Sequence, residues 1–315
     1  MAEHDHPSVE SAPKGLVIFH GVLKKRRALM WRGFSFSSLG LGWILLFLAL
    51  PCLSLFVVSF ATRGDYGDIQ WTFTLENMKH LLGFGFFGWS ADNLLILWRS
   101  IVVGVVTTFL CVVLSYPLAF FLAMRPARTR TLWLTVLLIP FWTNLVIRTY
   151  AWLLALAPGM PLASLLARFE IIQRGEALYP SVFAVYIGMV SVFLPFTALP
   201  LYTAVERLDW TLIEAARDLY GKGWRVFRHA ILPQTLPGLS VGINLTLIPA
   251  MGMFVVPDLM GGAKTVLVGN VIRNQFLTAR DWPFGAAAAM LLLLATLAFT
   301  LFYTRKAGFD EDLLV

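Results

Sequence analysis

The sequence predicts an all-α membrane protein with six membrane-spanning helices. Its 315 residues are 58% hydrophobic and only 14% charged, whereas soluble domains are about half apolar and a quarter charged. Long runs without charged residues recur along the chain, and Lys and Arg are unevenly distributed between the segments that join these runs. The net charge of +7 could indicate a nucleic-acid partner, but the basic residues follow the topology expected in a membrane, so no nucleic acid is expected.

The charge-free runs define the expected helices. A bilayer core needs about 20 helical residues. Merging two runs that only Arg148 separates gives six spans, near residues 40–61, 96–122, 132–156, 180–203, 236–257 and 283–304. Pro158 and Gly159 should end the third span. A short interfacial helix is expected after it, around residues 162–170.

Lys and Arg set the expected orientation. With the N-terminus in the cytoplasm, inner segments hold 16 of these residues and outer loops hold 7, with Arg99 and Arg148 inside spans. The sequence therefore predicts cytoplasmic tails at residues 1–36 and 306–315. Between them we expect a first membrane helix at 40–61 and a core of five further helices at 95–305.

One polar segment, Asp209–Pro237, lies between two charge-free spans and faces the cytoplasm in this orientation. Asp209 can cap a first short helix, and Thr211 with Glu214 offers a competing capping box. Gly221 should end that helix, because glycine turns without a Cβ penalty.

A second short helix is expected after the glycine hinge. Trp224, Phe227 and Ile231 recur at helical spacing. Pro233 should end this helix, and Pro237 suits the first turn of the next one.

The sequence of this segment resembles the cytoplasmic coupling motif of ABC-importer permease subunits. That motif consists of E-A-A, a glycine hinge and L-P. Here the motif residues are Glu214, Ala215, Ala216, Gly221, Leu232 and Pro233. Two positions depart from the family pattern, because Tyr220 stands where the glycine usually falls and Ala230 where an isoleucine does. The resemblance implies the type I importer permease fold, with this segment, residues 209–233, docked on an ATP-hydrolysing subunit.

The fifth predicted span is a poor continuous helix, because it contains Pro249, Gly252 and Pro257. Irregular backbone at membrane depth is tolerated where it lines a cavity or is buried in protein. We therefore expect this span to form part of a pore wall. Asn244 within it could hydrogen-bond a neighbouring helix or line the path.

Asp258 follows the broken span and is the acidic residue best placed at its outer end, with Trp142, Tyr150 and Trp152 as candidate aromatic neighbours. Carboxylates and aromatic faces are the groups that would suit a cation, if the cargo is one. Asp258 could instead cap a loop helix or pair with Lys264. Arg148 could snorkel to the outer end of its span.

Three further stretches are similar to permeases for spermidine and putrescine. They are F-W-T-N-x-x-x-R at residues 141–148, the loop at 259–272 and A-R-D-W-P-F-G at 279–285. The G-G-x-K-T letters in the loop lack the spacing of a phosphate-binding loop. No motif for a catalytic site, metal or cofactor is present, so the chain is not expected to be an enzyme.

These resemblances imply the membrane permease of a bacterial inner-membrane importer for polyamines. Its implied partners are cytoplasmic ATPase subunits, a second permease that is expected to be a paralogue, an external solute-binding protein and membrane lipid. An importer permease for another small solute and a stand-alone secondary transporter remain as alternatives. The second alternative normally needs groups for a coupling ion inside its spans, and almost none are present here.

Overall fold

The structure is a computed structural model that describes residues 38, 40–85, 88–168, 177–221, 223–262 and 265–306. The chain divides into two units, Met1–Leu55 and Phe56–Val315, which we describe separately. Most of helix Gly40–Val58, which is long and apolar enough to cross a membrane, lies in the first unit. The predicted tails lie outside the described residues, apart from Lys306.

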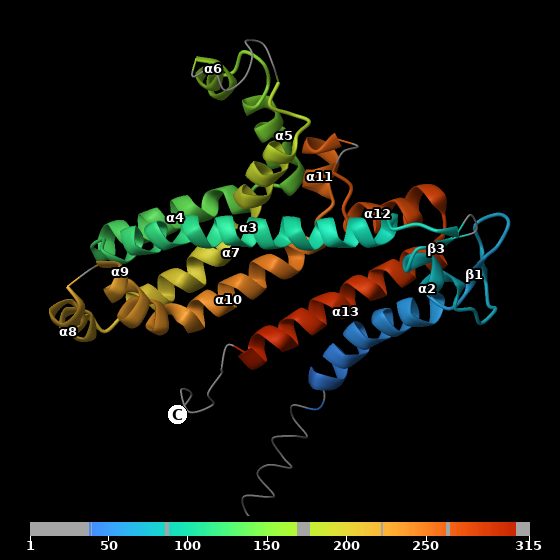
Figure 1. Ribbon diagram of the computed structural model, residues 1–315, viewed down its shortest axis with the longest axis horizontal. Helices are drawn as coiled ribbons and strands as arrows, with labels where there is room; N and C mark the ends of the chain where they lie inside the picture. The colour runs from blue at the N-terminus through green and yellow to red at the C-terminus, as the bar shows by residue number, and fades with distance from the viewer. Residues whose placement is uncertain are drawn as a thin grey trace, which may run out of the picture. The chain divides into compact units, whose positions relative to one another are not determined.

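The second unit is almost entirely helical (Figure 1). Its described helices are α2 Glu76–Leu81, α3 Asp92–Ala123, α4 Ala127–Trp142, α5 Leu145–Ala155, α6 Pro161–Arg168, α7 Val182–Glu206, α8 Trp210–Tyr220, α9 Gly223–Val226, the π-helical turn η1 Phe227–Ile231, α10 Leu232–Met251, α11 Val255–Met260, α12 Val268–Asn274, the π-helical turn η3 Gln275–Ala279 and α13 Trp282–Lys306. Two small antiparallel ladders precede α3. They pair β1 Thr62–Arg63 with β2 Ile69–Gln70, and β3 Phe84–Gly85 with β4 Gly88–Trp89. The predicted all-α class is confirmed, and α6 confirms the short helix expected near 162–170.

Four continuous helical runs of the second unit can cross a membrane by length and composition: α3, α7, Gly223–Met251 and α13. Helices α4 and α5 form one further candidate, but they meet at an angle of 96°. With Gly40–Val58, the described residues hold five such helices, or six if the bent pair is one span. The prediction of six spans agrees with this count if the bent pair is one span, but an unbroken third span at 132–156 is wrong.

Helices α3, α7 and α10 pack side by side as the centre of the second unit (Figure 1). Small residues let these helices approach closely, as is common between membrane helices. A Cβ atom on Gly238 of α10 would lie 2.6 Å from the carbonyl oxygen of Pro200 on α7. The hydroxyls of Thr197 and Thr246 form a buried hydrogen bond of 2.6 Å between the same two helices.

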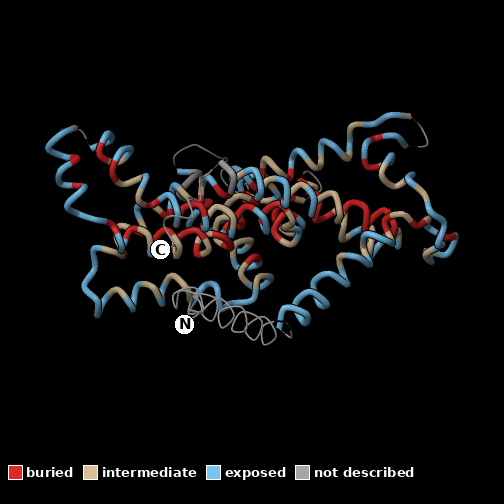
Figure 2. The backbone as a smooth tube through the Cα atoms, turned by 90° about the horizontal axis from the view of Figure 1, so that it is seen from below, coloured by how far each residue is buried: buried red, intermediate tan, exposed pale blue. Residues whose placement is uncertain are grey.

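Buried side chains gather in clusters that hold the functional segments. One cluster joins Leu122 of α3 and Val205 of α7 to Ile213 of α8. Another joins Met189 of α7 to Met260 of α11. Figure 2 shows buried positions in red alternating with exposed positions in pale blue along the helices. Helix α8 and the α11 region are thus fastened to opposite ends of the same central bundle.

The fifth predicted span is broken as expected. Helix α10 ends at Met251 with Gly252 as its C-cap, and α11 begins at Val255, after Phe254 as its N-cap. The helical run before the break is longer than predicted, because it starts at Gly223 rather than near residue 236.

The predicted stop at Pro233 is wrong. The π-helical turn η1 connects α9 to α10 without interruption, so Pro233 and Pro237 both lie inside one helical run. Pro233 is the second residue of α10, and the π-helical turn just before it changes the hydrogen-bond pattern at that point of the run.

Candidate functional site

The predicted coupling segment forms a helix, a glycine hinge and a return into α10. Asp209 caps α8 by accepting a hydrogen bond of 2.9 Å from the backbone N–H of Thr211. Hydrogen bonds from the Thr211 side chain and N–H hold the pKa of Asp209 below its usual value. The cap is therefore ionised at neutral pH, and its contribution is lost only as the pH falls through that lowered pKa.

One detail of the coupling segment differs from expectation. The capping box of Thr211 and Glu214 is not used, because Asp209 provides the cap. Glu214 is the fifth residue of α8 and so lies beyond the first turn, where the helix dipole would favour a carboxylate. Gly221 ends α8 as predicted, with a left-handed φ of 62°.

Helix α8 presents an exposed face that the described residues leave uncovered. Ile213 and Ala216 are buried against the bundle, whereas Glu214 and Ala215 are exposed. Leu212 and Leu219, at 55% and 81% exposure, share a side of the helix with Ala215. Exposed apolar side chains beside charges are typical of a surface that meets another protein.

The Gln234 side chain links the start of the coupling segment to its end by hydrogen bonds, and nothing in the sequence singled this residue out. Its Oε1 accepts a 3.0 Å hydrogen bond from the backbone N–H of Asp209, and its Nε2 donates to the carbonyl of Ala230 in η1. One side chain thus joins the start of α8 to the start of α10. A lone amide between two prolines gives no sequence signal for this contact.

We expect Gln234→Leu to loosen the coupling segment. The substitution keeps the size of the side chain but removes both hydrogen bonds, each of which contributes about 1 kcal/mol. Transport turnover should fall while the protein still inserts into the membrane. The measurement is the uptake rate beside the thermal unfolding temperature. Thr203→Val is the control, because its hydroxyl bonds only to Pro200 of its own helix; equal effects of both variants would contradict the role of Gln234.

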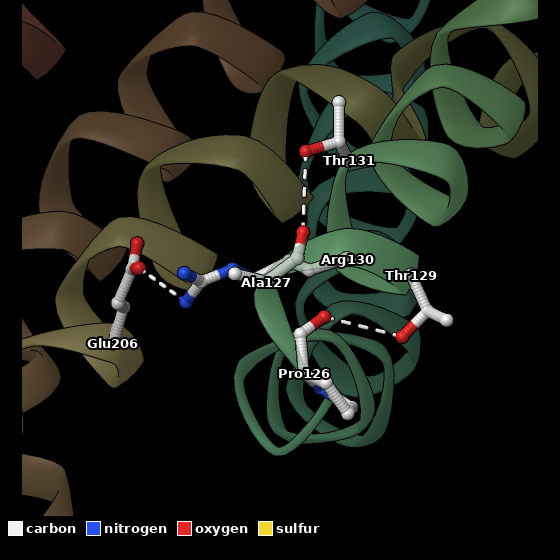
Figure 3. A network of polar contacts seen from close by, with 6 residues as sticks. All are labelled: Pro126, Ala127, Thr129, Arg130, Thr131 and Glu206. Carbon is white, nitrogen blue, oxygen red and sulfur yellow. Dashed lines mark hydrogen bonds and ion pairs between the residues drawn. The ribbon is translucent and has the colours of Figure 1, made fainter.

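An ion pair fastens α4 to the end of α7, just before the coupling segment. Arg130 near the start of α4 pairs with Glu206, the last residue of α7 (Figure 3). Figure 3 also shows Thr129 and Thr131 bonded to carbonyls in the first turn of α4. Because both charged side chains are partly exposed, the pair contributes at most about 1 kcal/mol. It therefore links the start of α4 to the end of α7 without contributing much to stability.

The break in the fifth span is held by the start of α12. A Cβ atom on Gly269 would lie 2.3 Å from the carbonyl oxygen of Gly252, so only glycine permits this approach. The Asn270 side chain donates to the carbonyl of Phe254 at 3.0 Å. The backbone N–H of Val268 donates to the hydroxyl of Ser100 on α3 at 2.8 Å. Gly269 and Asn270 were missed as individual residues, although the loop that contains them was noted.

Asp258 lies in the first turn of α11, and its partner is a residue that the sequence did not indicate. Its carboxylate forms an ion pair with the guanidinium of Arg273 on α12. The Arg273 guanidinium also lies 6.0 Å from the ring centroid of Phe254. The alternative partner Lys264 lies outside the described residues.

The three candidate aromatic residues lie on the bent third span, but they do not form one group. Trp142 is 77% exposed at the end of α4, and Tyr150 is 52% exposed on α5. Trp152 is partly buried and lines a cavity of about 820 Å³ together with Arg148 and side chains of α3, α4 and α7. Helix α11 packs against α5, yet the carboxylate of Asp258 binds Arg273 rather than these rings.

Arg148 forms a hydrogen bond across the bend between α4 and α5, whereas the sequence suggested that it could snorkel to the outer end of its span. Asn144 caps α5 by accepting from the N–H of Val146 at 2.8 Å. Arg148 donates across the bend to the carbonyl of Pro140 at 2.7 Å. The last carbonyls of a helix lack intrahelical partners and carry its negative dipole end. The break in the helix thus explains one donor of Arg148, whereas its Nε is buried and has no hydrogen-bond partner among the described residues.

Asn244 bonds within its own helix. Its amide nitrogen donates to the carbonyl of Ser240 at 3.1 Å. Its Oδ1 atom is buried and has no hydrogen-bond partner among the described residues. A buried acceptor normally has a hydrogen-bond partner. This oxygen can therefore accept a hydrogen bond from a group that is not among the described residues.

The fold and the sequence together define the class of protein. Residues 115–305 match the family described as binding-protein-dependent transport system inner membrane component, and the chain belongs to this family. It is therefore a membrane component of a transport system rather than an enzyme, as predicted. The fold agrees, because the structure superposes with a TM-score of 0.66 on a chain of a bacterial ABC transporter involved in the import of alginate. That match has 15% identity and covers 90% of this chain and 98% of the other.

Particular relatives are much closer in sequence. The spermidine/putrescine transport system permease protein PotB of Escherichia coli (strain K12) is 42% identical over 266 residues, which cover 84% of this chain and 94% of the relative. PotB of Haemophilus influenzae is 38% identical over 266 residues, which cover 84% of this chain and 91% of the relative. The predicted resemblance to this subgroup is confirmed over most of the chain.

Proposed function

We propose that this chain is the permease subunit of an ATP-driven importer for polyamines. The observation that carries the proposal is 42% identity to a spermidine/putrescine permease over 84% of the chain. The subunit works with cytoplasmic ATPase subunits, a paralogous second permease and an external solute-binding protein. Both chain termini and α8 face the cytoplasm, as the distribution of Lys and Arg favours.

In this proposal α8 is the contact with the ATPase. Its exposed face of Glu214, Ala215 and Leu219 is available for docking. The buried face, with Ile213, passes movement of α8 to α3 and α7 through their shared cluster. Gly221 and Gln234 keep the helix at a fixed angle to α10. Closure of the ATPase pair would therefore move the central bundle as one piece.

The cargo path follows the broken fifth span. Asp258 offers a carboxylate and Phe254 an aromatic face, and cations bind to both kinds of group. The unpartnered oxygen of Asn244 lies deeper along the same span and adds an acceptor. Arg148 keeps its positive charge, because the Pro140 carbonyl that accepts its hydrogen bond is neutral. It lines the cavity formed by α3, α4, α5 and α7, whereas the proposed path follows α10 and α11.

We expect Asp258→Asn to slow polyamine uptake. Removing one partly exposed carboxylate weakens its interaction with an ammonium group by up to about 1 kcal/mol, or about fivefold in rate. Assembly with the ATPase should not change. The measurement is uptake of labelled spermidine and putrescine in cells that lack other polyamine importers, with Asp65→Asn in the exposed loop between β1 and β2 as the charge control.

The same cells test the proposed substrate. Accumulation of an anionic or neutral solute, with no polyamine uptake by a complete and well-expressed complex, would refute the polyamine assignment. The permease family would stand, because it rests on the family match.

A further inference from the structure

We propose that Arg273 is an internal competitor for the cation site at Asp258, so that an arriving polyamine must displace the guanidinium before it can bind. The proposal rests on the polyamine importer proposed above. It assigns to Arg273 a role in setting affinity that the sequence did not indicate.

The contacts of Arg273 are those that an ammonium group would use. Its guanidinium pairs with the carboxylate of Asp258 and lies 6.0 Å from the Phe254 ring. A carboxylate beside an aromatic face is a favourable setting for an organic cation. The site is thus occupied by a cation of the chain itself.

The ion pair is accessible and exchangeable. The side chains of Arg273 and Asp258 are 36% and 45% exposed, and ion pairs of this kind are weak, at about 0–1 kcal/mol. A ligand with several ammonium groups can therefore compete for the carboxylate. A deeply buried pair could not be exchanged in this way.

The architecture around the pair does not depend on it. The start of α12 is held to the break by Gly269, by the Asn270 bond to Phe254 and by the Val268 bond to Ser100. Release of Arg273 therefore leaves α12 in place. It follows that a variant without the guanidinium should fold and assemble.

The test is the binding of labelled spermidine to the complete permease–ATPase complex in lipid nanodiscs, without the solute-binding protein. Arg273→Gln should bind about two- to fivefold more tightly than the unmodified complex, because the competitor is gone. Arg273→Lys, which keeps a cation beside Asp258, should bind like the unmodified complex. Arg280→Gln removes a positive charge seven residues further along the chain that forms no ion pair among the described residues, and it should have little effect.

A double-variant comparison separates competition from simple repulsion between cations. Competition requires the gain from Arg273→Gln to be largest when Asp258 is present, and to shrink in the Asp258→Asn background. An equal gain in both backgrounds, or weaker binding by Arg273→Gln with a lower unfolding temperature, would overturn the proposal. If Arg273→Gln fails to assemble, the pair is architectural and the proposal is equally overturned.

The control for the proposed function is spermidine uptake by the unmodified complex. If it transports no spermidine, the proposed function fails first. If it transports spermidine and the variants do not follow the stated order, only the role of Arg273 fails.

Discussion

Glu214→Lys should abolish transport while the protein remains inserted and folded. The carboxylate is exposed on α8, beside Ala215 and away from the buried face of Ile213. Reversing its charge should therefore leave the bundle intact but place a cation where we propose that the ATPase binds. Like charges or an unpaired charge at an interface cost several kcal/mol, so uptake should fall more than about tenfold.

Two measurements define this result. Uptake gives the loss of function, and co-purification with the ATPase subunit locates it at the interface. The control is Asp65→Lys, which makes the same change in a loop far along the chain from α8. Normal uptake by a well-expressed Glu214→Lys variant would show that α8 does not make the functional contact.

Gly269→Ala should damage the break in the fifth span. The added Cβ atom would lie 2.3 Å from the carbonyl oxygen of Gly252, and backbone atoms cannot move aside as a flexible side chain can. The start of α12 must shift, which removes the hydrogen bond from Asn270 to Phe254. Overpacking of this kind costs about 1–3 kcal/mol. If the transport-competent state is destabilised by this amount, uptake should be slower by about five- to 150-fold.

Gly252→Ala is a matched control at the same junction. Its added Cβ atom would lie 3.6 Å from the Leu292 side chain, an ordinary contact, and its φ of −90° suits alanine. We therefore expect near-normal uptake and stability from Gly252→Ala. Both variants should still bind the ATPase, because α8 lies at the other end of the bundle. The account of the junction is contradicted if the two alanine variants behave alike.

Features that depend on local chemistry could be predicted from the sequence. Charge-free runs located the spans, because a bilayer excludes charge. Asp209 and Gly221 marked the two ends of α8, since a carboxylate caps a helix start and glycine adopts the left-handed end. Pro249 and Gly252 indicated the broken fifth span, which the structure confirms.

The bend of the third span was missed because its signal is weak. Asn144 is a good N-cap, but it lies in an otherwise apolar run that reads as one helix. The stop at Pro233 was wrong because a π-helical turn accommodates the proline. Local rules describe single helices and do not show how one helix continues into the next.

The tertiary partners could not be predicted from one sequence. Gln234 reaches back 25 residues to Asp209, and Asn270 reaches back 16 to Phe254. Arg273 forms an ion pair with Asp258, which lies 15 residues earlier in the chain and before a loop. Such contacts depend on how α11 and α12 fold onto the bundle. The sequence therefore indicated the regions of the site more successfully than its individual pairs.

The central claim is that this chain is the membrane permease of an ATP-driven polyamine importer. It is tested most directly in proteoliposomes that contain the complete complex, with ATP supplied to the ATPase side and loaded solute-binding protein on the other. We predict spermidine uptake that requires ATP, the ATPase subunit and the binding protein together. Spermidine uptake by this chain alone, driven by an ion gradient without the ATPase, would contradict the claim.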